Sequence, residues 1–529
     1  MRLYLVITLC FLSFMAFGGC SKSTVPTEIA IPDGISASVK VSDKVLNTVN
    51  PLIFGDNMEW VNDGMGVWIP KEKRLDDEIV KEFKALGITH LRYPGGTLSD
   101  CFDWYDAIGK ERKPISNPFR EYKREYPYFG PEEFMQLCRK LEIPGTITFN
   151  AGTGKPEDAI KWAEYIKKEN FNVTSFTVGN ELYLTKSDDP MAKTAQQYID
   201  FFLKCKEGLD KVAPDVKLGV ISLHDSRYMP IKENRNWMKD VLTALGDKID
   251  FVDVHNSYAP IVRGVGFSPD KLYPDNDFAL CFMGASVHVQ KDIALVKEDI
   301  AKYAPNNEKN IDLNITEYGP LVYPLKKERA FEDISWNRTL AGSLYLACLY
   351  NVFLKDPKLT SANHLPLCQD VFAALLGIRG TYPDRKLWRN IVYYVFQSYA
   401  GMIGRDVIET AVECPTYSVP AMGLVSKLDG VPYVDVGAYK KKDGKELTLF
   451  LINRSIKNNA KVKIEPGFTN FKVISTTVMT SDSYKDENNS DKPNKVIPVN
   501  KPEDASTHTG TFNITLPKHS FTVINVGGI

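Results

Sequence analysis

Short apolar segments and amphipathic segments alternate along this chain from about residue 50, and this alternation restricts the fold more than any other feature. The apolar segments are rich in Val, Ile, Phe and Thr and are nearly continuous, which is typical of parallel strands buried on both faces. We expect eight strands, at residues 52–57, 89–94, 145–150, 175–180, 217–223, 250–255, 312–316 and 361–366.

The amphipathic segments predict eight helices, at residues 75–86, 131–141, 156–168, 192–213, 236–245, 289–303, 334–354 and 387–403. In the first of them, Leu75, Ile79, Val80, Phe83 and Leu86 fall on one stripe, as on a helix that covers a core. Eight strand–helix units in succession predict an α/β fold, a closed (β/α)8 TIM barrel of parallel strands within a ring of helices. We place this barrel at residues 49–404.

After about residue 405 short alternating strands follow one another without a strong helix. The expected strands are 432–439, 446–453, 460–464, 471–480, 511–516 and 520–526, and the polar segment 481–506 is expected to be an exposed loop. This pattern predicts a C-terminal antiparallel β-sandwich domain at residues 405–529. The segment 35–48 contains one more strand before the barrel, and we expect it to pair into the sandwich.

The first twenty residues have the composition of a secretory signal. Arg2 precedes an apolar run over residues 3–17, which is too short to span a bilayer comfortably, and Gly18, Gly19 and Cys20 follow. Cys20 followed by a polar tether over residues 21–34 resembles a bacterial lipoprotein signal, with lipid on the cysteine. We therefore expect an exported protein, periplasmic or anchored in the outer membrane of a Gram-negative bacterium through its lipid alone. Simple cleavage to a soluble secreted protein is the alternative.

Charge and cysteine content exclude several classes of protein. The chain has 65 Lys+Arg against 66 Asp+Glu, so it lacks the basic footprint of a nucleic-acid binder. No CxxC spacing occurs among its 9 cysteines, so neither a disulfide framework nor a zinc ribbon is expected. No GxGxxG sequence opens a helix after a strand, which argues against a dinucleotide site. One or two disulfides stay open in an exported chain.

Two glutamates directly follow apolar strands, Glu181 on the fourth and Glu317 on the seventh. The carboxyl ends of barrel strands face one pocket, so these side chains are expected to meet there. A single glutamate in such a position is often a helix cap or an ion-pair partner. Two facing carboxyls, however, are the requirement of glycoside hydrolysis, in which one protonates the leaving oxygen and the other attacks the anomeric carbon or activates water. We expect Tyr318 or Tyr258 to donate a hydrogen bond to Glu317.

Around these residues the chain resembles glycoside hydrolase family 51, mainly α-L-arabinofuranosidases, within the clan of barrel glycosidases that carry glutamates on strands four and seven. The resemblance covers nearly the whole mature chain. It rests on Ile53-Phe54-Gly55 with Glu59, Arg92-Tyr93-Pro94-Gly95-Gly96, Trp104 with Asp106, Asn150 with Gly152-Thr153-Gly154, Gly179-Asn180-Glu181 and Glu317-Tyr318-Gly319.

The resemblance implies a retaining exo-acting α-L-arabinofuranosidase with Glu181 as acid/base and Glu317 as nucleophile. It implies a carbohydrate substrate of plant type, neither metal nor cofactor, and compatibility with a homo-oligomer. Asn180 would contact the sugar, Glu59 would hold ring hydroxyls, and Tyr258 would lie near the nucleophile. The expected substrate-binding residues are Glu59, Trp60, Arg92, Thr97, Asn150, Asn180, His255, Tyr258 and Tyr318.

Three positions depart from the family pattern, and all lie in the expected sugar pocket. Thr97 stands where asparagine is usual, Trp60 stands where histidine is usual, and two residues instead of one separate His255 from Tyr258. These changes leave other retaining glycosidases open, such as a β-xylosidase, a β-glucuronidase-like enzyme or an endo-β-glucanase. An alternative of another class is a surface lipoprotein that binds glycans without cleaving them.

Overall fold

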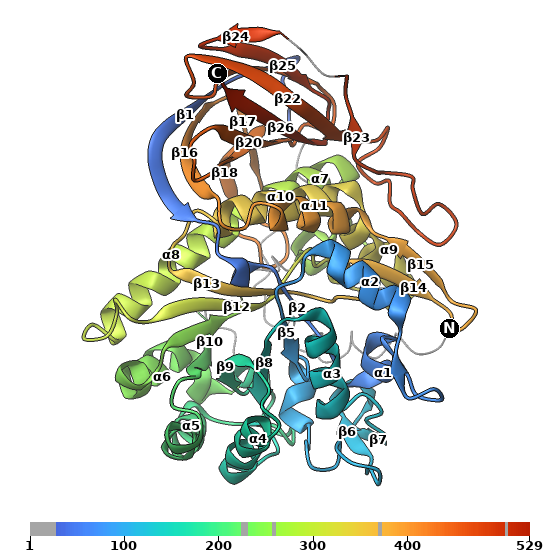
Figure 1. Ribbon diagram of the computed structural model, residues 1–529, viewed down its shortest axis with the longest axis vertical. Helices are drawn as coiled ribbons and strands as arrows, with labels where there is room; N and C mark the ends of the chain where they lie inside the picture. The colour runs from blue at the N-terminus through green and yellow to red at the C-terminus, as the bar shows by residue number, and fades with distance from the viewer. Residues whose placement is uncertain (1–27, 224–230, 256–260, 369–372, 503–505) are drawn as a thin grey trace.

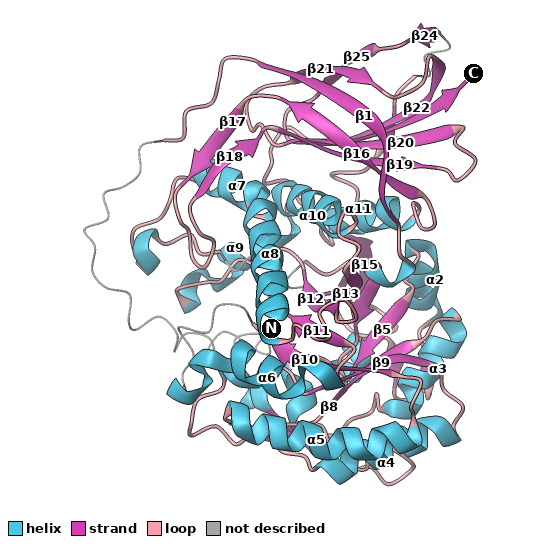
Figure 2. Cartoon of the chain, turned by 90° about the vertical axis from the view of Figure 1, so that its left-hand side faces the viewer, coloured by secondary structure: helices cyan, strands magenta, loops and turns pink. Residues whose placement is uncertain are grey.

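A computed structural model of the chain describes residues 28–223, 231–255, 261–368, 373–502 and 506–529. Within these residues a parallel barrel forms the lower body in Figure 1, and a strand-rich domain lies above it. The helices α7, α10 and α11 lie between the two bodies in both views (Figure 1, Figure 2).

The barrel closes through eight parallel strands in the order β10-β11-β12-β13-β2-β5-β8-β9, which confirms the predicted fold class. Its strands are β2 (Gly55–Asn57), β5 (His90–Tyr93), β8 (Gly145–Phe149), β9 (Val173–Val178), β10 (Lys217–Ser222), β11 (Phe251–Val254), β12 (Asp312–Tyr318) and β13 (Leu359–His364). Each lies within three residues of its predicted limits. The largest difference is at the first strand, where Pro51–Ile53 forms a 3-10 helix capped by the Asn50 side chain instead of continuing the strand.

The helices are α1 (Val61–Met65), α2 (Asp77–Leu86), α3 (Pro131–Leu141), α4 (Pro156–Lys168), α5 (Ala195–Val212), α6 (Trp237–Leu245), α7 (Asp275–Gly284), α8 (Ser286–Tyr303), α9 (Ala330–Ser335), α10 (Leu340–Phe353) and α11 (Ile391–Ala400). In α2 the Asp76 side chain accepts the backbone N–H groups of Glu78 and Ile79, and Gly87 ends the helix with a φ of 83°. These capping groups satisfy polar backbone groups at both ends, which explains where the helix begins and stops.

Two predictions for the barrel need correction. Residues 387–389 were expected in a helix, but they belong to a hairpin of β14 (Leu376–Arg379) and β15 (Lys386–Arg389), and α11 starts only at Ile391. The helix α7 was not predicted, because its side chains are buried all round and give no amphipathic period. Within the described residues only the run Asp275–Tyr303 is long and apolar enough to cross a membrane, and most of its apolar stretch is buried, as in a core helix.

The upper domain is one ten-stranded sheet in the order β23-β22-β26-β20-β19-β16-β1-β21-β25, with β24 paired to β22. Its strands are β1 (Ile35–Thr48), β16 (Asp406–Glu413), β19 (Val434–Lys440), β20 (Glu446–Asn453), β21 (Ala460–Glu465), β22 (Asn470–Met479), β23 (Val499–Asn500), β24 (Thr507–Thr509), β25 (Phe512–Leu516) and β26 (Ser520–Gly528). All pairs are antiparallel except that of β1 with β21, which is parallel. The strand before the barrel thus joins this sheet, where it lies between β16 and β21.

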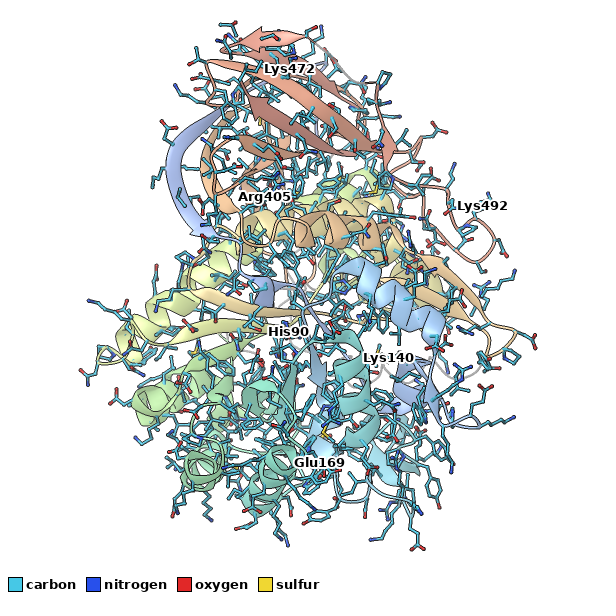
Figure 3. The ribbon with its side chains drawn as sticks, viewed as in Figure 1. His90, Lys140, Glu169, Arg405, Lys472 and Lys492 are labelled. Atoms are coloured by element: carbon cyan, nitrogen blue, oxygen red, sulfur yellow. The ribbon has the colours of Figure 1, made fainter. Side chains whose placement is uncertain are left out.

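Short hairpins complete the chain: β3 (Trp68–Ile69) with β4 (Arg74–Leu75), β6 (Ile115–Asn117) with β7 (Lys123–Glu125), and β17 (Thr416–Val419) with β18 (Leu428–Pro432). Arg405 lies at the junction of the two domains (Figure 3). Its carbonyl accepts the N–H of Val49, and its side chain donates to Thr448.

The segment 481–506 is not simply an exposed loop, as the sequence suggested. The side chain of Asn488 is fully buried and exchanges two hydrogen bonds with the backbone of Val496. The Asp486 carbonyl also accepts the N–H of Leu340 at the start of α10. Polar composition therefore predicted exposure for a segment that uses its amide side chain to pack on the barrel. The cysteines of the described residues are all unpaired, and all but Cys414 are buried.

Candidate active site

Glu181 and Glu317 meet at the carboxyl end of the barrel, where the sequence placed them. Glu181 follows β9, Glu317 lies near the end of β12, and their exposed fractions are only 8% and 7%. One oxygen of each carboxyl and one ring nitrogen of His255 all lie within 4.8 Å of one another. Two carboxyls this close match the short spacing of retaining glycosidases, about 5 Å, and not the wider spacing of inverting ones, about 6.5–9.5 Å.

The Arg92 guanidinium binds Glu317 and links it to groups on or next to three other strands. Its Nη1 donates to Glu317 Oε1 at 2.8 Å and to Asn57 Oδ1 at 3.1 Å. Its Nη2 donates to Asn180 Oδ1 at 2.7 Å, and its Nε donates to Thr148 Oγ1 at 3.0 Å. Arg92 is 1% exposed, so these bonds act at low dielectric and fix the position of Glu317.

Asn180 keeps its amide nitrogen available for a ligand. Its Oδ1 is occupied by Arg92, whereas its Nδ2 is buried and has no partner among the described residues. An unpaired buried donor costs free energy, which a hydroxyl of a bound substrate would recover. This geometry agrees with the sugar contact that the sequence resemblance implies.

His255 holds the second glutamate. Its Nδ1 lies 3.0 Å from Glu181 Oε1, and its Nε2 lies 3.1 Å from Thr316 Oγ1 and 3.5 Å from Asp253 Oδ1. Burial alone would lower the pKa of His255, but the charge of Asp253 and the hydrogen bonds to Asp253 and Glu181 raise it to about 10. The imidazole is therefore a cation at neutral pH, and it presents an N–H to Glu181.

Charges around the pair also set the ionisation of Glu317 and Glu59. Burial raises the pKa of Glu317, and the positive charges of His255 and Arg92 oppose this shift. Burial and the nearby charge of Glu317 raise the pKa of Glu59 to about 7 against the effect of Arg92. Glu59 is thus electrostatically coupled to the nucleophile candidate and can carry a proton near neutral pH.

Glu181, His255 and Glu317 also have the composition of a metal site. A divalent cation there would have to bind beside the Arg92 guanidinium and would displace the proton of a charged imidazole. Both effects are electrostatically unfavourable, so the donor set fits acid–base chemistry better than metal binding.

Glycines bring the backbone close to the carboxyls. A Cβ atom on Gly96 would lie 2.0 Å from Glu317 Oε1, so no larger residue fits there without moving the carboxyl. Gly95 has a φ of 118°, which side chains rarely tolerate, and a Cβ atom there would lie 3.1 Å from Glu59 Cγ. Thr97 follows directly and begins the 3-10 helix η3 (Thr97–Cys101), half-buried at the edge of the site.

Two expected substrate residues have other roles in this structure. The Tyr318 hydroxyl pairs with Tyr350 Oη at 2.9 Å and points to the Ile53 carbonyl, so it does not donate to Glu317. Successive residues of β12 point to opposite sides, so Tyr318 points away from the barrel interior that Glu317 faces. Its side chain is fully buried there. The Asn150 oxygen accepts the N–H groups of Thr153 and Gly154, so this side chain shapes the loop after β8.

Of the remaining expected residues, the structure describes Trp60 but neither Tyr258 nor Cys20. Trp60 is 1% exposed and packs against Phe102, with ring centroids 6.0 Å apart, and its Nε1 has no partner in the described part of the chain. Tyr258 and Cys20 lie outside the described residues.

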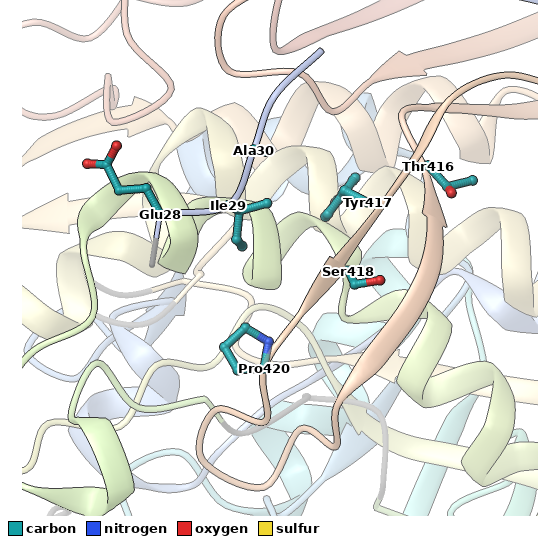
Figure 4. A pocket seen from close by; sticks show the side chains of 7 residues that line it. All are labelled: Glu28, Ile29, Ala30, Thr416, Tyr417, Ser418 and Pro420. Carbon is teal, nitrogen blue, oxygen red and sulfur yellow. The ribbon is translucent and has the colours of Figure 1, made fainter. Parts of the chain in front are cut away.

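A surface hollow lined by Glu28, Ile29 and the β17 segment lies away from the catalytic pair and contains no paired carboxyls (Figure 4).

Asp100 is a site residue that sequence reasoning missed. Its carboxyl is buried and accepts the N–H of Asn180 at 3.0 Å and that of Ala151 at 3.2 Å. It therefore ties the loops after β8 and β9 together and positions Glu181, whose backbone has the uncommon φ of 36°. In the sequence Asp100 looks like an ordinary acidic residue in the first turn of a helix, so no signal marked it.

Comparisons with known proteins identify sequences and structures that this chain resembles. Residues 82–168 match the model of the α-L-arabinofuranosidase 1 domain, and residues 323–520 match that of the α-L-arabinofuranosidase C-terminal domain. The exo-α-(1→6)-L-arabinofuranosidase of Bifidobacterium longum is 24% identical over 90% of this chain and 94% of its own length. The intracellular exo-α-(1→5)-L-arabinofuranosidase of Acetivibrio thermocellus is 23% identical over 92% of this chain and 98% of its own.

Solved structures show the same fold. An α-L-arabinofuranosidase from Thermotoga maritima, crystallised with arabinose, superposes with a TM-score of 0.76 at 20% identity over 93% of this chain and 100% of its own. A family 44 xyloglucanase from Paenibacillus polymyxa superposes with a TM-score of 0.58 at 12% identity over 93% of this chain and 99% of its own. Because these two proteins are named for different substrates, the fold alone does not identify the sugar.

We predict that Asp100→Asn lowers kcat on an aryl glycoside by about 10- to 100-fold and changes KM by less than about twofold. The amide nitrogen would face one of the two backbone N–H groups and repel it, which would displace Asn180 and Glu181. Asp103→Asn is the matched control, because this nearby exposed side chain accepts backbone N–H groups of its own loop, those of Tyr105 and Asp106, and none from Asn180 or Ala151. An unchanged kcat for Asp100→Asn would remove Asp100 from the positioning role.

We also predict a pH signature for His255. Since the unfolded side chain loses its proton near pH 6.5 and the folded one near pH 10, its stabilising effect is full below 6.5 and is lost as pH rises to about 10. The fall of Tm between pH 7 and 10 should therefore be smaller in His255→Gln than in the wild type, as measured by scanning calorimetry. The control His288→Gln should follow the wild type above pH 7, because burial lowers the pKa of His288. Parallel curves for wild type and His255→Gln would contradict the assignment of a charged imidazole.

Proposed function

Because this chain belongs to the glycoside hydrolase family 51-like α-L-arabinofuranosidases, we propose that it is a retaining exo-α-L-arabinofuranosidase. The observation that carries the mechanism is the approach of the Glu181 and Glu317 carboxyls to within 4.8 Å at the ends of β9 and β12, which β10 and β11 separate in the barrel. This distance leaves room for a sugar carbon between the carboxyls, but not for an additional water.

In the first step, Glu317 attacks the anomeric carbon and forms a glycosyl ester, while Glu181 gives its proton to the departing oxygen. Arg92 holds Oε1 of Glu317, which directs Oε2 toward the sugar. In the second step Glu181 takes a proton from water, the resulting hydroxide attacks the same carbon, and Glu317 is released. Two inversions at one carbon give net retention.

The sugar would be held by groups that are otherwise unpaired. Asn180 Nδ2 supplies a donor, and Glu59, with its pKa near 7, supplies an acceptor or a donor according to pH. The relatives named above are arabinofuranosidases, which supports arabinofuranose as the sugar. Thr97 and Trp60 leave a β-xylosidase, a β-glucuronidase-like enzyme or an endo-β-glucanase as the alternatives.

The test of function is turnover of p-nitrophenyl α-L-arabinofuranoside by the chain lacking residues 1–20. We expect Glu317→Gln to reduce kcat by several orders of magnitude, because no covalent intermediate can form. Glu181→Ala should retain much more activity on this activated substrate than on a natural saccharide, since p-nitrophenolate leaves without a proton.

Equal losses for Glu181→Ala on both substrates would contradict its role as the acid. Turnover of another p-nitrophenyl glycoside, but not of the arabinofuranoside, would show that the proposed sugar is wrong and would leave the proposed mechanism in place. Normal activity of Glu317→Gln would reject the assignment of Glu317 as the nucleophile. Binding of polysaccharide without turnover of any glycoside would favour the non-catalytic alternative.

We infer further that the enzyme is exported and carries lipid on Cys20. The basic residue, the apolar run and the small residues before Cys20 support this inference. Several arabinofuranosidase relatives are named intracellular, so export would set this chain apart from them. The lipid would be its sole link to a membrane and would keep it at the periplasmic or outer surface of a Gram-negative cell.

We predict that the wild-type chain expressed in a Gram-negative host incorporates labelled palmitate and sediments with membranes. Cys20→Ala should lose both the label and the sedimentation, because the acceptor thiol is gone. Cys414→Ala, which changes a half-buried cysteine of the sheet domain, is the control and should behave like the wild type. Labelling of Cys20→Ala, or a soluble wild type, would contradict lipidation.

A further inference from the structure

Two tyrosines stand exposed on the connection between β5 and α3. Tyr126 and Tyr128 are 54% and 50% exposed, and their rings stack with centroids 6.0 Å apart and planes inclined by 17°. Tyrosine offers a flat apolar face with a polar tip, the combination that is enriched at binding surfaces. A neighbouring pair of such faces in water is more than the scattered single exposure that needs no explanation.

The backbone that carries these rings is held rigidly. Arg112 Nη1 donates to the carbonyls of Pro127 and Tyr128, at 2.8 and 2.9 Å. Arg112 Nη2 pairs with Glu133 Oε1 at 2.7 Å, and both side chains are only 12% exposed. The Tyr128 N–H also donates to the Tyr126 carbonyl at 3.0 Å. A surface ordered in advance loses little conformational entropy when a ligand binds.

The pair lies on the Glu181 side of the active site. It directly follows the β6–β7 hairpin, which packs against η3, the 3-10 helix of Thr97 and Asp100. In that hairpin, Tyr122 Oη donates to Asp189 Oδ1 at 2.6 Å, and Asp189 lies in the segment that follows Glu181. An acid that protonates the leaving oxygen faces the part of the substrate that departs. The remainder of a polysaccharide therefore extends toward this side.

We propose that Tyr126 and Tyr128 form a stacking surface for a sugar unit of the polysaccharide chain that carries the cleaved residue. A pyranose or furanose ring presents C–H groups on its faces and hydroxyls at its rim. The C–H faces pack on the tyrosine rings, while the hydroxyls stay in water or bond to the phenol groups. This inference rests on the proposed glycosidase function and adds a site for the part of the substrate outside the catalytic pocket.

The test compares a small and a polymeric substrate in the double variant Tyr126→Ala/Tyr128→Ala. We expect kcat/KM on p-nitrophenyl α-L-arabinofuranoside to stay within about twofold of wild type, since this substrate ends at the leaving group. On arabinan or arabinoxylan, KM should rise by about tenfold while kcat changes little. The double variant Tyr126→Phe/Tyr128→Phe keeps both rings and should retain the wild-type KM.

The control is Ile474→Ala, which removes a 46% exposed side chain from β22 in the sheet domain. It should change neither kcat/KM on the aryl glycoside nor KM on the polymer. An unchanged polymer KM in the alanine double variant overturns the proposal, as does an equal loss on the aryl glycoside.

If no glycoside is turned over, the proposed function fails. Retardation of the protein in gels containing arabinan or arabinoxylan then decides whether the tyrosine pair binds polysaccharide. Retardation of the wild type but not of the alanine double variant supports it. Equal mobility of the two, or no retardation of either, rejects it.

Discussion

The catalytic end of the barrel depends on the buried guanidinium of Arg92. Its three nitrogens donate to groups on or next to four other strands, so one planar cation sets the relative positions of β2, β8, β9 and β12. A buried charge is costly unless it is fully paired, and here Glu317 supplies the opposite charge and neutral oxygens supply the rest. Because the guanidinium is planar and its N–H groups have fixed directions, displacement of one strand end would strain its bonds to the others.

Sequence patterns predicted the barrel and the glutamate pair for a clear reason. Parallel strands buried on both faces must be apolar, and residues that follow them must gather at one end, so position in the chain determines position in space. The predicted hydrogen bond from Tyr318 to Glu317 is wrong, because the residue after Glu317 points to the other side of β12, where Tyr318 bonds to Tyr350. Asp100 escaped notice because its role depends on backbone N–H groups from two loops, and backbone partners leave no trace in side-chain patterns.

The two functional parts of the site differ in how strongly the rest of the fold fixes them. The carboxyls are positioned by strand ends, a buried cation and glycines that admit no side chain, so the reaction type follows from the scaffold. Thr97, which we expect to contact the sugar, is instead half-buried at the edge of the site, and none of the bonds that fix the carboxyls involves its side chain. A family can therefore keep one hydrolytic mechanism while its members act on different glycosides.

The position of β1 gives the chain an unusual connectivity. β1 ends just before the barrel begins and β16 starts just after it ends, and the two strands pair along their length although Ser38 and Glu413 are 375 residues apart. The sheet therefore holds both ends of the barrel segment side by side, as a covalent ring closure would. A single cut in a barrel loop would leave two fragments that remain joined through this sheet. While the sheet is folded, it also lowers the conformational entropy of an unfolded barrel segment, because it holds the two ends of that segment together.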